Sequence, residues 1–109
     1  MDKTIKIVFE DTGDWWEIKR YLTVGIEREY REIIVDAQAI GDDTAKLHKV
    51  ASAVDQMVVN STVAWSYGSI TLATLLAEIP SHHYDQIIER VHELYSPKVI
   101  EDLKRIVND

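Results

Sequence analysis

The chain has 109 residues, 46% hydrophobic and 28% charged, which is the size and composition of one folded domain and excludes an intrinsically disordered chain. It has no cysteine, so disulfides and thiolate metal sites are excluded and a reducing cytoplasm is the expected compartment. Twelve basic against nineteen acidic residues leave a net charge of −7, which argues against nucleic-acid binding, and no apolar run approaches the roughly 20 residues that cross a bilayer.

Residues 1–22 are predicted to form a β-hairpin. Ile5, Ile7 and Phe9 alternate with residues of the opposite face, which is the period-two pattern of a half-buried strand. Turn-forming residues follow, and a second strand then places Trp16 and Ile18 on one face. Because a lone hairpin is marginally stable in water, we expect it to pack on helices or to pair with another chain.

Residues 23–109 carry the apolar period of amphipathic helices. The first helix is expected to begin after Thr23 as its N-cap and to end at Gly41 as its C-cap. The second begins at residues 42–44 and runs to about Val63, although the β-branched residues near its end leave a strand open. The apolar stripe of this second helix consists of Leu47, Val50, Ala51, Val54, Met57 and Val58.

Three further helices are expected to complete the helical part. A short one begins after Thr71 and ends before Pro80, because the residue before a proline avoids helical angles. Ser81 is expected to cap the next helix, and Ser96 caps the last, with a proline at its first position. Residues 1–109 are therefore predicted to form a single α+β domain, mainly α, with an N-terminal β-hairpin followed by about five helices.

The four histidines are the first candidates for a metal site. A zinc site needs three or four convergent ligands, whereas the adjacent His82 and His83 are expected to diverge on a helix. Glu89 and His92 match the carboxylate–histidine spacing of di-iron bundles, but such bundles need that pair twice. We therefore interpret these three histidines and His48 as surface residues, and we expect no metal.

No other catalytic pattern is visible in the sequence. The serines lack the glycine-flanked elbow of a hydrolase nucleophile, and the hydroxyl residues at 23, 71, 81 and 96 are explained as helix caps. Paired carboxylates lie at turns or helix starts, where the helix dipole favours them. Four isolated glycines form no phosphate-binding loop. We expect no enzymatic activity, no catalytic residue and no cofactor.

Aromatic and C-terminal apolar side chains are the candidates for partner binding. Trp and Tyr are enriched at binding hot spots, and they are also ordinary core residues. For Trp16 and Trp65 the core is the better interpretation, whereas Trp15 fits an exposed position or a partner contact as well as burial. The last helix closes the core of its own domain, lies with its apolar stripe in a partner's groove, or itself forms part of a groove. The candidate partner-binding residues are Trp15, Trp65, Tyr67, Leu103, Ile106 and Val107.

Two segments resemble the tail assembly chaperones of long-tailed bacteriophages. Residues 16–25, WEIKRYLTVG, are similar to the opening of that family, where a strand with a tryptophan precedes an L-T-x-G step and a charged helix. Residues 63–80 are similar to its second half, in which a hydrophobic step ending in tryptophan is followed by a leucine-rich helix that closes on proline. The resemblance covers residues 14–95.

The resemblance implies a protein without enzymatic activity in the host-cell cytoplasm during phage assembly. Such chaperones coat the aggregation-prone tape-measure protein and help to recruit tail-tube subunits. Many are made in two forms, the longer by a translational frameshift, and this chain corresponds to the short form. Self-association is compatible with this reading, and neither nucleic acid nor membrane is expected as a partner. The alternatives are a structural virion protein, such as a head–tail connector or decoration subunit, and an acidic inhibitor or immunity protein.

Overall fold

The structure is a computed structural model that describes residues 3–95 of the chain. Within this range the elements follow in the order β1 (Thr4–Val8), β2 (Trp15–Lys19), α1 (Val24–Gln38), α2 (Asp43–Ser61), β3 (Thr62–Trp65), α3 (Leu72–Glu78) and α4 (Ser81–Leu94). The predicted class, α+β and mainly helical, is confirmed. Four helices lie in the described part of the chain rather than the five expected overall. The fifth, after Ser96, falls outside the described residues.

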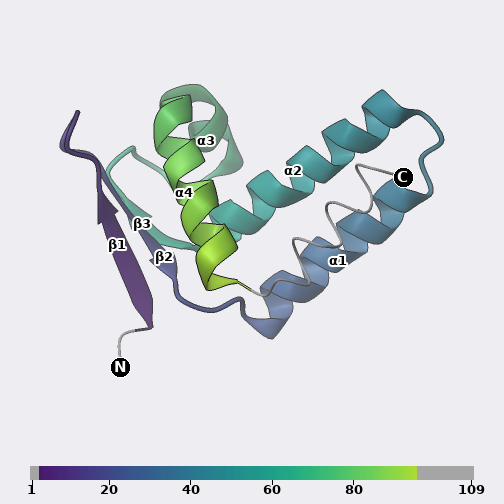
Figure 1. Ribbon diagram of the computed structural model, residues 1–109, viewed down its shortest axis with the longest axis horizontal. Helices are drawn as coiled ribbons and strands as arrows, with labels where there is room; N and C mark the ends of the chain where they lie inside the picture. The colour runs from purple at the N-terminus through teal and green to yellow at the C-terminus, as the bar shows by residue number, and fades with distance from the viewer. Residues whose placement is uncertain (1–2, 96–109) are drawn as a thin grey trace.

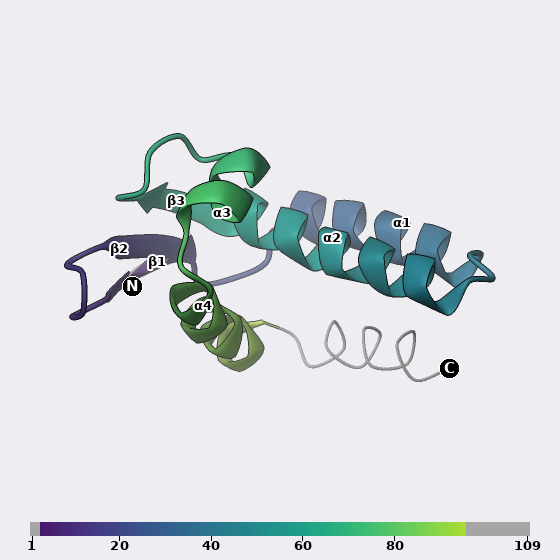
Figure 2. The same cartoon turned by 90° about the horizontal axis from the view of Figure 1, so that it is seen from above.

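The strands form one antiparallel sheet in the order β1-β2-β3 (Figure 1). The helices α1 and α2 pack side by side as a long pair that extends away from the sheet, while α3 and α4 lie next to it (Figure 2). None of the helices in the described range has both the length and the apolar character that crossing a bilayer requires.

The predicted hairpin of β1 and β2 is confirmed. Ile5 and Ile7 are partly buried and Phe9 is buried, as the alternation predicts. The turn is closed by two backbone bonds of 2.8 Å, from the Phe9 N–H to the Asp14 carbonyl and from the Gly13 N–H to the Phe9 carbonyl. Gly13 has a φ of +78°, which residues with a side chain rarely adopt. Asp11 of this turn contacts His82 and His83 in α4.

The segment after α2 is a strand, which the β-branched residues had left open, and the helix does not reach Val63. The helix ends at Ser61, and β3 pairs with β2, which makes the sheet three-stranded instead of a two-stranded hairpin. The Trp16 indole N–H donates to the Thr62 hydroxyl at 2.9 Å, and this hydroxyl donates to the carbonyl of Val58 at 2.8 Å. The β-branched residues Thr62 and Val63 therefore form a strand because β2 lies beside them, and the local sequence pattern does not show this neighbour.

Three of the helix starts have side-chain caps, and those of Thr23 and Thr71 are the predicted ones. The side chain of Thr23 accepts from the Ile26 N–H at 3.4 Å, and that of Asp42 accepts from the Ala45 N–H at 2.8 Å. Thr71 caps α3 in the same way. Each cap satisfies a backbone donor that would otherwise lack a partner in the first turn.

Two other cap predictions are wrong. The helix α1 ends at Gln38 with Ala39 as its C-cap, and Gly41 does not take the positive φ of a glycine C-cap. Ser81 is already the first residue of α4, and Pro80 occupies the N-cap position without a side-chain bond. The fixed extended conformation of Pro80 sets the helix start one residue earlier than the serine suggests.

Trp16 lies at the centre of the core and has no exposed surface. Its ring meets Trp65 edge-on, with the ring centroids 5.0 Å apart, and stacks on Tyr84 of α4 at 6.4 Å. Trp65 is also buried, so both are core residues as predicted. Trp15 points the other way, is half-buried, and has the ammonium of Lys6 4.4 Å from its ring centroid.

Candidate functional site

One carboxylate and two imidazoles meet where the β1–β2 turn touches the first turn of α4. A carboxylate oxygen of Asp11 lies 2.7 Å from Nε2 of His82. The two oxygens of the same carboxylate lie 2.9 and 3.1 Å from Nε2 of His83. The chain separation is 71 and 72 residues, so tertiary packing alone brings these side chains together.

His83 is held in a single orientation. It is fully buried, and its Nδ1 lies 2.8 Å from the hydroxyl of Tyr67. One face of its ring stacks on Phe9 with the ring centroids 4.0 Å apart and the planes within 8°. Both ring nitrogens are therefore paired, and the aromatic contact prevents rotation of the ring.

Asp11 is the acceptor at the centre of this cluster. Hydrogen bonds from His82 first and then from His83 lower the pKa of its carboxyl from 3.8 to about 2, so the group is ionised at neutral pH. A carboxylate has no proton to donate. The protons of both contacts therefore sit on the Nε2 atoms of the histidines.

The turn that carries Asp11 is fastened to the segment after β3. The Ser66 hydroxyl donates to the Asp14 carboxylate at 2.9 Å and accepts from the Trp15 N–H at 2.9 Å. The Thr12 hydroxyl donates to the same carboxylate at 2.7 Å. These bonds, that of Thr12 first, lower the pKa of Asp14. The position of Asp11 is thus fixed from the sheet side as well as from α4.

The expectation that His82 and His83 diverge is wrong. Side chains of the first helical turn lean back towards the helix N-terminus, where Asp11 lies and is reached by both rings. The interpretation of all four histidines as surface residues is also wrong for His83, whereas His48 and His92 are exposed as expected. No spacing in the sequence connects residue 11 with residues 82 and 83.

A second feature is an apolar groove between α2 and α4. It is a shallow depression, open to solvent, of about 310 Å³, and its lining consists of Leu47, Val50, Ala51, Val54, Asp55, Tyr84 and Ile88. Asp55 is the one charged group among these lining residues, and it accepts a hydrogen bond from the Tyr84 hydroxyl.

The groove explains why the predicted apolar stripe of α2 is wider than its buried face. Met57 and Val58 of the stripe are buried in the core. Leu47 is 46% exposed, Ala51 is exposed and Val54 is half-buried, and these three line the groove. The sequence pattern identified them as apolar, but not as a separate surface.

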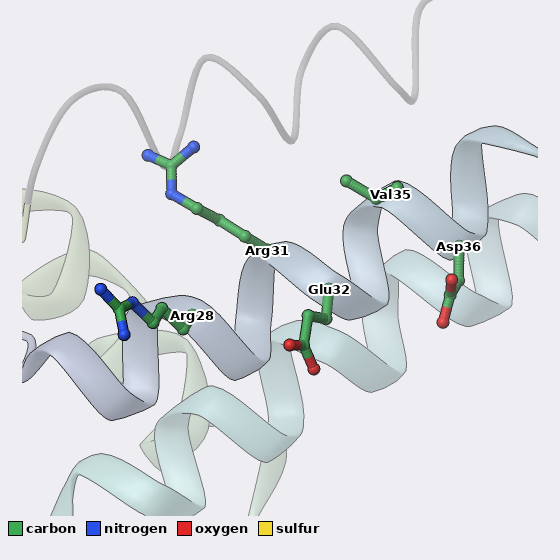
Figure 3. Close-up of a pocket in the computed structure, with 5 residues that line it drawn as sticks. All are labelled: Arg28, Arg31, Glu32, Val35 and Asp36. Atoms are coloured by element: carbon green, nitrogen blue, oxygen red, sulfur yellow. The ribbon is translucent and has the colours of Figure 1, made fainter.

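A third hollow, on α1, has a different character. Its lining consists of Arg28, Arg31, Glu32, Val35 and Asp36, whose side chains leave one helix in several directions (Figure 3). Arg31 is bonded to Glu27 one helical turn away, at 3.0 Å. Charges of both signs on one helix are typical of a solvated face, so this hollow supports no particular ligand.

The candidate partner-binding residues of the sequence do not gather at the groove. Trp65 is buried, and its indole N–H donates to the Gly68 carbonyl at 2.9 Å. Tyr67 faces His83, and Trp15 lies under Lys6. Leu103, Ile106 and Val107 lie outside the described residues.

Comparisons with models of protein families, with curated proteins and with solved structures each find no match for this chain.

Proposed function

We propose that this protein binds a helical segment of another protein in the groove between α2 and α4, and that it acts as a tail assembly chaperone for a phage tape-measure protein. The observation that carries the proposal is the groove itself. Six of its seven lining residues are aliphatic or aromatic, and nearly half of the Leu47 surface is exposed to solvent. Exposed apolar surface that two rigid helices present together is typical of a site for a partner.

The shape of the groove favours a helix as the occupant. The residues Leu47, Ala51 and Val54 follow one another along α2 at spacings of four and three, and Tyr84 and Ile88 are four apart on α4. An amphipathic helix presents its own anchors at the same three- and four-residue steps, so it can lie between these two rows. Tape-measure proteins, with long amphipathic helices, offer such segments repeatedly.

Charge favours a partner with basic residues beside its apolar stripe. The chain carries a net charge of −7, and Asp55 lies in the groove lining. Such a field speeds the encounter with a basic partner and keeps many copies of the chaperone soluble while apolar surface is exposed. The recruitment of tail-tube subunits belongs to the same proposal and rests on the family resemblance.

Co-expression tests this proposal. The untagged full chain is produced together with a tagged tape-measure protein encoded beside it, and soluble complex is measured after affinity purification. We expect a complex with the unchanged chain and its loss with Leu47→Asp or Ala51→Glu, which place a charge in the groove. Leu76→Asp is the matched control, because Leu76 is 69% exposed on α3 and away from the groove.

Two results would contradict the proposal. One is that the unchanged chain leaves the partner insoluble and forms no complex. The other is that Leu47→Asp, shown by circular dichroism to be folded, binds as well as Leu76→Asp. Mass spectrometry of purified phage particles then separates a chaperone from a structural subunit, because a chaperone is absent from the finished particle.

A further inference from the structure

We propose that Asp11, His82 and His83 form a binding site for a zinc ion. This inference is independent of the groove and concerns the N-terminal turn of α4. The three side chains offer two imidazole nitrogens and one carboxylate oxygen, and these ligand atoms all lie within 4.8 Å of one another. The donor set suits zinc, which takes nitrogen and carboxylate ligands in tetrahedral sites.

The spacings from the Asp11 carboxylate to the two imidazoles are close to what zinc needs. A tetrahedral ion with bonds of about 2.0–2.1 Å holds its ligand atoms roughly 3.3 Å apart. The contacts of 2.7 and 2.9 Å from Asp11 to His82 and His83 are slightly shorter than this. His82 is 61% exposed on its side chain, so it can adjust its position when the ion binds. The buried His83 keeps its place.

Tyr67 supplies the outer contact that zinc-binding histidines normally have. A metal-bound imidazole usually donates its second N–H to an oxygen, which fixes the ring. The Tyr67 hydroxyl lies 2.8 Å from Nδ1 of His83 and is positioned to accept that bond. When zinc binds Nε2 of the neutral ring, the single ring proton moves from Nε2 to Nδ1, and the Tyr67 hydroxyl changes from donor to acceptor.

The site is open on one side. The side chains of Asp11 and His82 are 49% and 61% exposed, so an ion can enter from solvent, and water can fill the coordination positions that the protein leaves. Magnesium and calcium prefer all-oxygen ligands, and two imidazoles therefore select against them. Zinc bound here links the β1–β2 turn to α4.

Calorimetry with the full chain, free of any histidine tag, tests the proposal. We expect one zinc ion to bind per chain, and magnesium at the same concentration not to compete. His82→Ala is the main variant, since this exposed side chain is removed without opening the core, and it should weaken zinc binding more than tenfold. His48→Ala and His92→Ala are the matched controls, because both residues are exposed, and they should leave the affinity unchanged.

Tyr67→Phe separates a built site from a chance pair of histidines. Loss of the outer contact should weaken zinc binding roughly 10–100-fold while all three ligands remain. Nitrogen-15 NMR of the imidazoles should show zinc on Nε2 of His82 and His83, with the proton of His83 on Nδ1. The proposal is overturned if zinc does not bind, if His82→Ala binds it as tightly as the unchanged chain, or if a control variant abolishes binding.

Discussion

The indole nitrogen of Trp16 and the hydroxyl of Thr62 form a buried hydrogen bond of 2.9 Å across 46 residues of chain. The same hydroxyl donates to the carbonyl of Val58. The bond joins β2 to the point where α2 ends and β3 begins, and both partners are buried. Trp16 is thereby held in the orientation that lets it stack on Tyr84 and meet Trp65 edge-on.

Thr62→Val should destabilise the protein by about 1–3 kcal/mol, because the buried indole N–H of Trp16 loses its acceptor. Thr62→Ser keeps the hydroxyl and is the matched control, expected to cost about 1 kcal/mol for the lost methyl group. Urea denaturation followed by tryptophan fluorescence measures both. Equal stability of the two variants would show that the hydrogen bond contributes little.

Asp42→Ala should cost about 1 kcal/mol, because it removes the acceptor for the first-turn N–H of Ala45. Asp42→Asn retains an accepting oxygen and should stay close to the unchanged chain. Thermal denaturation at low and high salt separates the contribution of the helix cap from that of the negative charge. A loss that appears equally in Asp42→Asn would assign the effect to charge rather than to the cap.

Substitution by alanine should lower the stability of the protein at Gly13 but not at Gly41. Gly13 has a φ of +78°, so Gly13→Ala should destabilise the hairpin by about 1–2 kcal/mol. Gly41 lacks a positive φ, and a Cβ there meets nothing within 4 Å. Gly41→Ala should therefore be neutral or stabilise by up to about 1 kcal/mol through the unfolded chain. Chemical denaturation gives both changes in the free energy of unfolding. A destabilised Gly41→Ala would contradict a backbone conformation at residue 41 that alanine can adopt.

Tyr95 should make stability fall at alkaline pH. Burial raises the pKa of its hydroxyl above the ordinary 10.0, and this hydroxyl donates to the carbonyl of Lys19 at 2.9 Å. Because the folded pKa is the higher one, the stabilisation is complete below pH 10 and is lost as the pH rises above it. Denaturation from about pH 8 to about pH 11 should decline less steeply for Tyr95→Phe than for the unchanged chain. If stability falls with pH equally steeply in Tyr95→Phe and in the unchanged chain, the Tyr95 hydroxyl is not the cause of the alkaline loss.

Local signals in the sequence were sufficient for much of the fold. Thr23, Asp42 and Thr71 cap helices through side chains that act within three residues of their own position, so neighbouring residues alone identify them. The alternation in β1 and the burial of Trp16 also follow from short-range patterns. The starts of α1, α2 and α3 and the apolar face of β1 were therefore predictable.

Contacts between distant segments were not predictable in this way. The strand β3 exists because β2 provides a partner, and nothing near Thr62 specifies that pairing. Asp11 meets His82 and His83 only after the sheet and α4 have packed together. The groove was missed for a related reason, since periodicity shows that Leu47 is apolar but not whether another helix covers it.

The helical pair α1–α2 is the connection between β2 and β3, and this affects the order in which the chain folds. Joining two strands through a long flexible loop costs entropy that grows with loop length. Here the connection is two helices in mutual contact, and their formation brings the end of β2 towards the start of β3. We therefore expect the helical pair to form in the folding transition state and the β2–β3 pairing to follow, so that Ala53 in α2 has the higher φ-value and Ala64 in β3 the lower.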